Sequence, residues 1–190
     1  VQTTSTLPYF ISWVIVYGLT YALFSSEGPI NQILALFGKS QNLLIDRDRT
    51  YLFQSILYLW KMLGWNSIIY VAAIAGIDPQ LYEAASIDGA GHFRQAWHIT
   101  VPGILPTFVV LMLLGVADFV NNSMDQYYVF QNAMVYNKIE TLELYTYKQG
   151  IRLMDYSFAT AVGIFKSVIC ITLLFVTNTV AKKVRGESII

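Results

Sequence analysis

The sequence predicts an all-α integral membrane protein with four transmembrane helices, and three observations lead to this fold class. Apolar residues make up 55% of the 190-residue chain and charged residues only 13%, whereas an average soluble domain is about 25% charged. Four stretches approach the length of about 20 mostly apolar residues that a membrane-spanning helix needs. The aromatic content of 15% excludes a disordered chain and a coiled coil.

The predicted spans are separated by long connectors. The spans cover residues 7–25, 57–77, 104–119 and 158–181. The first contains no charged residue, and the second contains Lys61 within one turn of its start, where a long side chain can carry its ammonium to the interface. The connector over 120–156 holds six tyrosines, which indicates either a membrane–water interface or rings exposed for stacking on sugars.

Composition and motifs exclude several classes of function. Twelve Lys and Arg residues balance twelve Asp and Glu residues, so there is no excess of positive charge to bind nucleic acid. His92 and His98 are too far apart for a helical metal-binding pair, and the single Cys170 excludes sites built on cysteine pairs. The chain has no phosphate-binding loop and no hydrolase signature. We therefore expect no metal, no cofactor, no nucleic acid and no catalytic residue.

The connector over 78–103 has the pattern of a helix–turn–helix. Asp78 suits the N-cap of a helix and the proline after it suits the first helical position. The Gly-Ala-Gly sequence at 89–91 interrupts this helix, where glycine permits a positive φ and a close backbone approach. A second short helix is predicted over 93–98 and is expected to stop at Pro102, whose nitrogen cannot donate a hydrogen bond. Such a compact, partly apolar unit outside the bilayer is suited to docking into a groove on another protein.

A spaced motif runs through the same connector. Glu83-Ala84-Ala85 is followed after three residues by Gly89, then by Ile99 and by Val101-Pro102. This pattern resembles the EAA loop of the permease subunits of binding-protein-dependent ABC importers, in which the motif usually ends Ile-x-Leu-Pro. The phrase LYEAASIDGAG and the flanking WKMLGWNSIIYVAAIAGIDP and YSFATAVGIFKSV are similar to the branch that transports sugars and complex carbohydrates.

The resemblance implies the type I importer permease fold and a coupling role for this loop. Permeases of the family usually have six spans, so the chain is expected to be the C-terminal four of a longer subunit, forming a single transmembrane domain over 1–190. In the family the loop faces the cytoplasm and inserts into a cleft on an ATPase subunit. The residues implied in that coupling contact, or in the shape of the loop, are Glu83, Ala84, Ala85, Gly89, Ile99 and Pro102.

The distribution of cations does not fix the orientation by itself. The side that holds the loop and the C-terminal tail carries Arg94, Lys182, Lys183 and Arg185. The opposite side carries Lys39, Arg47, Arg49, Lys138, Lys148 and Arg152. The tail cluster lies directly at a span end, where the positive-inside rule has most force, and this agrees with the cytoplasmic loop that the resemblance implies.

The resemblance also implies the partners and the setting. These are a dimer of ATPase subunits that binds ATP and magnesium, a second permease subunit, an extracytoplasmic solute-binding protein and a carbohydrate substrate. The chain itself is then not an enzyme, and it lies in the bilayer of a bacterial cell membrane. Two other functions stay open at this point, namely a permease for another solute and an integral-membrane enzyme.

Five residues within or near the predicted spans are candidates for lining a sugar path. They are Trp65, Asn66, Tyr70, Asp118 and Lys166. Ionisable groups inside a membrane are costly and usually face protein or water, so the Asp and Lys side chains either line the path, reach the interface or form a structural ion pair. Helix packing explains the three residues of the second span equally well.

Overall fold

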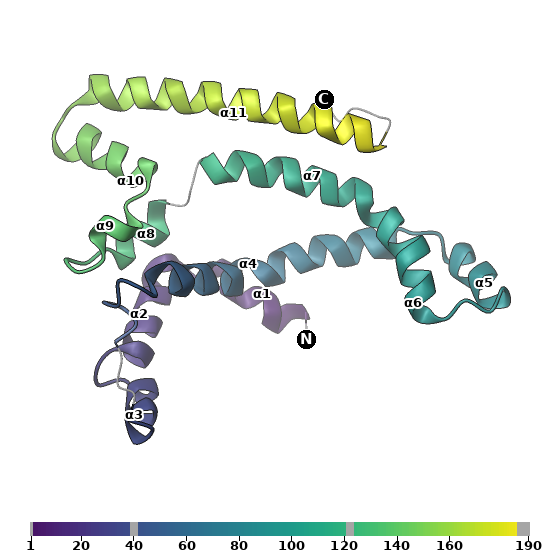
Figure 1. Cartoon of the computed structure of the whole chain (residues 1–190), viewed down its shortest axis with the longest axis horizontal. Coiled ribbons are helices and arrows are strands. Elements are labelled where there is room, and N and C mark those ends of the chain that lie inside the picture. Colours follow the sequence, from purple (N-terminus) through teal and green to yellow (C-terminus); the bar gives the residue numbers. More distant parts are fainter. Residues whose placement is uncertain (1, 39–41, 121–123, 186–190) are drawn as a thin grey trace. The chain divides into compact units, whose positions relative to one another are not determined.

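The computed structural model describes residues 2–38, 42–120 and 124–185, and all regular secondary structure within them is helical (Figure 1). The chain divides into two compact units. The first comprises Val1–Gly64 and Asn121–Phe165, and the second comprises Trp65–Val120 and Lys166–Ile190. The predicted all-α class is therefore confirmed. Lys39 and the side chains of Lys183 and Arg185, which enter the charge distribution above, lie outside the described residues.

Among the described residues, three helices are long and apolar enough to cross a membrane. They are α4 (Thr50–Ala75), the helical segment His92–Gly115, and Tyr156–Thr179 within α11 (Tyr156–Arg185). At most 11% of the residues in the most apolar window of each are buried within the protein. A helix that is apolar on all sides and so little covered is typical of a membrane span. These helices contain most of the spans predicted over 57–77, 104–119 and 158–181, although the membrane boundaries themselves stay a prediction.

The first predicted span is broken instead of continuous. Helix α1 (Gln2–Phe10) and helix α2 (Trp13–Phe24) replace the single helix expected over 7–25, and the segments Thr4–Phe10 and Trp13–Leu36 meet at a bend of 111°. Pro8 lies within α1 and removes a backbone donor near its end. Ser12 is extended and starts α2 as an N-cap, because its side chain accepts a hydrogen bond from the backbone nitrogen of Ile15.

Lys61 holds the broken end of α1. Its Nζ donates to the carbonyl oxygens of Pro8, Tyr9 and Ile11 at 3.1, 2.7 and 2.5 Å. The ammonium also lies 5.4 Å from the centroid of the Trp13 ring, and the residue is only 5% exposed. The ammonium is therefore satisfied by protein carbonyl groups, and its position relative to the membrane interface stays a prediction. Its charge meets the carbonyl end of α1, where the helix dipole is negative.

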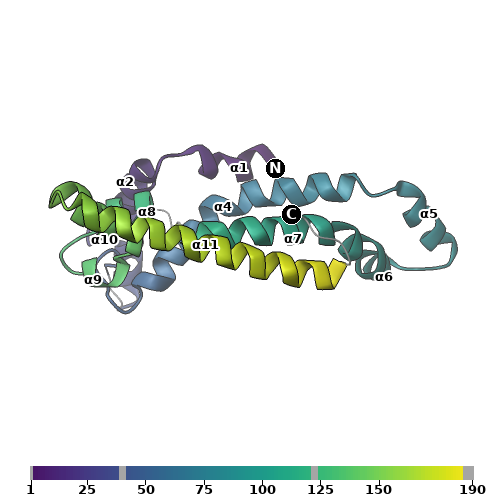
Figure 2. The same cartoon turned by 90° about the horizontal axis from the view of Figure 1, so that it is seen from above.

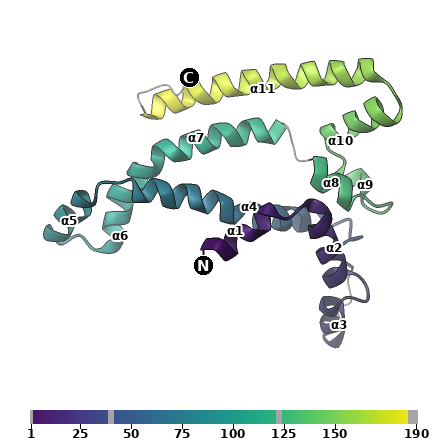
Figure 3. The ribbon, with the colours of Figure 1, turned by 180° about the vertical axis from the view of Figure 1, so that it is seen from behind.

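The core of the first unit joins four helices. Helices α2 and α4 are packed there with α8 (Met124–Phe130) and α9 (Tyr136–Ile139), and Figure 3 shows α8 and α9 next to each other. The buried residues of this core are Trp13, Val16, Phe53, Phe130, Val135 and Ile139. Helix α3 (Pro29–Leu36) follows α2, and α10 (Leu142–Tyr147) leads through a π-helical turn, Lys148–Arg152, towards α11. The described part of the connector over 120–156, from residue 124 onwards, is therefore mostly helical.

The second unit contains the connector between α4 and the third span. Helix α5 (Pro79–Ile87) is followed by α6 (His92–Gln95), the π-helical turn Ala96–Thr100 and α7 (Val101–Val120) (Figure 2). The second loop helix does not stop at Pro102, as the sequence had predicted, but continues into α7. The change of hydrogen-bond register at the π-helical turn places Pro102 at the second residue of α7, a first-turn position that does not need a backbone donor.

Candidate functional site

Helix α5 begins and ends as the sequence predicts. The Asp78 side chain accepts a hydrogen bond from the backbone nitrogen of Gln80 at 2.9 Å. At the other end the backbone nitrogen of Ala90 donates to the Ala85 carbonyl at 2.9 Å, which is the long bond of a Schellman motif. Gly89 has a φ of +75°, so the motif has its glycine at the left-handed position. Helix α5 therefore has a defined start and a defined end.

Side-chain hydrogen bonds tie the two halves of the loop together. The hydroxyls of Tyr82 and Thr100 share a hydrogen bond of 2.9 Å. The Gln95 Nε2 atom donates to the Ser86 hydroxyl and to the Ala90 carbonyl, both at 2.9 Å. These bonds connect α5 and the turn after it with α6 and the π-helical turn. The connector is thus one cross-linked unit, as a mechanical coupling element requires.

The loop exposes large apolar side chains that the sequence reasoning did not assign to a site. Phe93 is 95% exposed, Ile87 87% and Trp97 72%. Single apolar residues are normal on a protein surface, but three large and highly exposed ones within one short connector make this connector a candidate interaction surface. The signal in the sequence is the presence of Phe and Ile in a connector otherwise rich in Ala, Gly and polar residues. Glu83 is also exposed.

The structure divides the predicted coupling residues between the two loop helices. Glu83, Ala84 and Ala85 lie within α5, and Gly89 lies in the motif that ends it. Ile99 lies in the π-helical turn, and Pro102 lies at the start of α7. The four residues of the first half therefore form the tip of the loop, and the last two form its junction with the third span.

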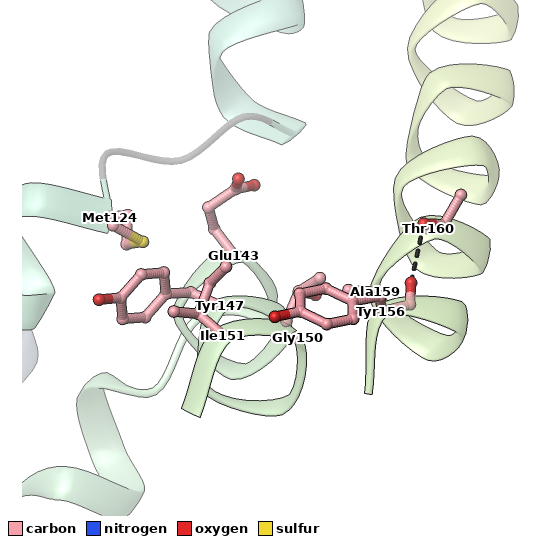
Figure 4. Close-up of a pocket in the computed structure, with 9 residues that line it drawn as sticks. Met124, Glu143, Tyr147, Gly150, Ile151, Tyr156, Ala159 and Thr160 are labelled. Atoms are coloured by element: carbon pink, nitrogen blue, oxygen red, sulfur yellow. Dashed lines mark hydrogen bonds between the residues drawn. The ribbon is translucent and has the colours of Figure 1, made fainter. Parts of the chain in front are cut away.

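A cavity of about 390 Å³ lies within the first unit, where α10 and the following π-helical turn meet the start of α11 (Figure 4). An ideal Cβ on Gly150 would lie 2.7 Å from the Cβ of Ala159, so the glycine permits this close packing. The Tyr147 and Tyr156 rings contribute aromatic surface. The lining residues are Met124, Glu143, Thr146, Tyr147, Gly150, Ile151, Tyr156, Ala159 and Thr160.

A second cavity of about 340 Å³ lies at the start of α4. Its lining is more polar and consists of Tyr51, Gln54, Ser55, Tyr127, Lys138, Ile139, Glu140 and Thr141. Hydrogen bonds from the fully buried Gln126 hold the Gln54 side chain in position. The Nε2 atom of Gln126 donates to Oε1 of Gln54 at 2.8 Å and to the backbone carbonyl oxygen of Gln54 at 3.0 Å. The sequence reasoning missed this cavity, since its walls come from segments more than 70 residues apart.

The residues predicted for a sugar path are not brought together around either cavity. Trp65, Asn66 and Tyr70 lie on the second half of α4, and none of them lines the two cavities described here. Lys166 is buried in α11, whereas Asp118 near the end of α7 is exposed. The role of these five residues in transport stays a prediction.

A comparison of the sequence with protein families shows to which family this chain belongs. The family described as the binding-protein-dependent transport system inner membrane component matches residues 1–186. The chain belongs to this family. The members of this family are inner-membrane components of transport systems and not enzymes.

The names of individual relatives describe the transport of sugars or larger carbohydrates. The polygalacturonan/rhamnogalacturonan transport system permease protein YteP of Bacillus subtilis is 39% identical over 191 residues, which cover 100% of this chain and 60% of the relative. The arabinooligosaccharides transport system permease protein AraP of the same organism is 27% identical over 177 residues, with 91% and 56% covered. The chain thus spans about 60% of the length of these curated relatives.

Solved structures agree with the family. A crystal structure of a bacterial ABC transporter involved in the import of the acidic polysaccharide alginate contains a chain that is 31% identical, with a TM-score of 0.92, and the match covers 97% of this chain and 65% of that one. The alginate transporter in complex with an alginate pentasaccharide-bound periplasmic protein gives 30% identity and a TM-score of 0.93, with 99% and 66% covered. The type I importer permease fold is therefore confirmed.

Proposed function

We propose that the chain is the part of an ATP-driven importer's permease subunit that couples to the ATPase and contributes to the path of a sugar or oligosaccharide. The observation that carries the proposal is the loop over 78–103, which is cross-linked internally and exposes Phe93, Ile87 and Trp97. An apolar surface on a rigid helical knob fits a hydrophobic groove on a partner protein. The predicted contact residues Glu83, Ala84, Ala85 and Gly89 lie in the same half of the loop as Ile87.

Carbohydrate is the substrate class that the relatives favour. Their names include polygalacturonan, rhamnogalacturonan and arabinooligosaccharides, and an alginate importer shares the fold. Two cavities with tyrosine in their walls also suit sugar rings, since aromatic side chains combine apolar faces with polar groups. The candidates on the spans, Trp65, Asn66, Tyr70, Asp118 and Lys166, belong to this proposal as wall residues.

The partners follow from the same proposal. An ATPase dimer would bind ATP and magnesium and receive the loop, and a second permease subunit would cover part of the apolar helices that this chain leaves exposed. An extracytoplasmic solute-binding protein would deliver the sugar, which is supported by the alginate transporter in complex with its periplasmic protein. The loop and the C-terminal tail would then be cytoplasmic, and the segments 27–50 and 120–156 would lie outside.

The test compares two glycines of the loop that differ in backbone conformation. Gly89 has a φ of +75° and Gly91 one of −69°, and an ideal Cβ meets nothing within 4 Å at either position. Valine at Gly89 therefore costs roughly 1–2 kcal/mol of backbone strain and distorts the end of α5, whereas valine at Gly91 is not strained. We expect Gly89→Val to insert normally in the membrane but to lose ATPase co-purification and sugar uptake, and Gly91→Val to keep more of both.

A milder loss is expected for Glu83→Ala, because it removes one exposed contact and leaves the shape of the loop intact. Uptake, co-purification and ATP hydrolysis stimulated by the loaded binding protein are measured for all variants in the assembled transporter. Wild-type uptake by Gly89→Val would show that the loop does not couple transport to ATP hydrolysis, and the proposed function would be abandoned.

A further inference from the structure

The cavity at the start of α4 carries one uncompensated positive charge. Among the described residues that line it, Glu140 is the only carboxylate, and its Oε1 atom lies 2.6 Å from the Lys148 ammonium. Lys148 does not line the cavity, and its ion pair with Glu140 neutralises the charge of this carboxylate. Lys138 also lines the cavity and has no ion-pair partner among the described residues. The remaining lining groups are neutral, so the Lys138 charge makes the cavity favour an anionic ligand over a neutral or cationic one.

The Lys138 ammonium is held in place by its surroundings. It lies over the Tyr51 ring, 5.6 Å from the ring centroid, a geometry that stabilises a cation by the negative face of the ring. Lys138 belongs to the short helix α9, which Ile139 anchors in the core of the first unit. A positioned ammonium of this kind costs less to order around a ligand than one on a free side chain.

Neutral groups suited to sugar hydroxyls surround this charge. Gln54 accepts from Gln126 through Oε1 and carries its own donors on Nε2. Ser55 and Thr141 add hydroxyls to the wall, and Tyr51 adds an aromatic ring. The volume of about 340 Å³ lies within the range of small-ligand sites, roughly 300–1,000 Å³.

We propose that this cavity is a subsite for an anionic sugar, in which the carboxylate of a uronic acid residue binds the Lys138 ammonium. The proposal rests on the proposed transport function and narrows its substrate class from carbohydrate to acidic carbohydrate. A neutral sugar of the same size would leave the ammonium partly desolvated without a partner, which selects against it. The chemistry agrees with the polygalacturonan and alginate in the names of two related systems.

The experiment measures protection of the cavity wall by a sugar. A cysteine replaces Ser55 in a cysteine-free background that includes Cys170→Ser, in the full permease assembled with its partners in lipid nanodiscs. Its modification by an uncharged maleimide is followed with increasing trigalacturonate, and with the methyl ester of trigalacturonate, which is larger by only one methyl group at each carboxyl group and has no charge. We expect trigalacturonate to slow the reaction, and the ester to need an about tenfold higher concentration, the factor for one hydrogen bond to a charged group.

Two further variants assign the effect to Lys138. In the Ser55 cysteine variant, adding Lys138→Gln is expected to make trigalacturonate and its methyl ester protect the cysteine at similar concentrations. Arg47→Gln is the matched control, because it removes a cation from the same predicted side of the membrane at an exposed residue that does not line the cavity. Equal protection by acid and ester, protection by neither, or an unchanged advantage in Lys138→Gln would each overturn the inference. Protection needs no ATP, so these outcomes are independent of the Gly89→Val test on which the proposed function depends.

Discussion

Replacement of Lys61 by methionine tests whether the break between α1 and α2 depends on a charge supplied by α4. Methionine keeps most of the length and apolar volume of the lysine stem but removes all three donors of the ammonium. The carbonyl oxygens of Pro8, Tyr9 and Ile11, which now accept at 3.1, 2.7 and 2.5 Å, would lose this partner. We expect α1 to detach from α4 and the free energy of unfolding to fall.

The size of the effect follows from the three hydrogen bonds. Interhelical hydrogen bonds in membrane proteins contribute roughly 0.6–1.7 kcal/mol each, so their joint loss amounts to about 2–5 kcal/mol. For a chain of this length a loss of 1 kcal/mol lowers the midpoint of thermal unfolding by about 2–4 °C, which gives a decrease of roughly 4–20 °C. Lys182→Met is the control, because Lys182 is exposed near the end of α11, and exposed substitutions usually change the stability by less than about 0.5 kcal/mol.

The midpoint is measured on the detergent-solubilised transporter by heating aliquots and quantifying the monodisperse fraction by size-exclusion chromatography. Expression in the membrane before heating is compared between the variants, so that an insertion defect is separated from a loss of stability. If Lys61→Met and Lys182→Met unfold at the same temperature, the three carbonyl contacts do not hold the break. The account of the broken first span given above would then be wrong.

The remaining predictions concern topology and helix packing. A cysteine at Gln95, in a background with Cys170→Ser, should react with a membrane-impermeant thiol reagent only after permeabilisation, and labelling of intact cells would exclude the cytoplasmic loop. Gly64→Ala should lower the yield of folded protein severalfold, because its Cβ would lie 1.8 Å from the Ser5 carbonyl oxygen and the backbone of α1 would have to move. Gly18→Ala has nothing within 4 Å and should keep the wild-type yield. Equal yields would show that α1 does not pack directly on α4.

Local signals predict the first half of the coupling loop well. Asp78 and Gly89 act through hydrogen bonds and backbone angles within a few residues of themselves, so the sequence contains all the information that these ends of α5 require. The same is true of the long helices α4 and α11, whose apolar composition is a property of the segment alone. Physical contacts that are local along the chain are therefore the ones that the pattern predicts.

The errors arise where distant segments meet. The break within 7–25 was missed, because Pro8 and Ser12 are only weak local signals and the ammonium that satisfies the end of α1 comes from Lys61, about 50 residues later. The cavity at the start of α4 combines α4 with α8 and α9, which no pattern within one segment can reveal. The prediction for Pro102, by contrast, failed for a local reason: the π-helical turn directly before it has no simple signature in the sequence.

The uninterrupted path from α6 through the π-helical turn into α7 makes the two arms of the coupling loop mechanically unequal. The segment His92–Gly115 is helical without a break, although it includes the π-helical turn Ala96–Thr100, so a force applied at Phe93 would pass to the third span through continuous helix. The other arm, α5, is separated from α4 by the non-helical residues 76–78, so a force applied to α5 would reach α4 only through a turn. In the proposed transport cycle, ATPase closure would therefore drive α7 as a lever, while α4 could keep its tilt.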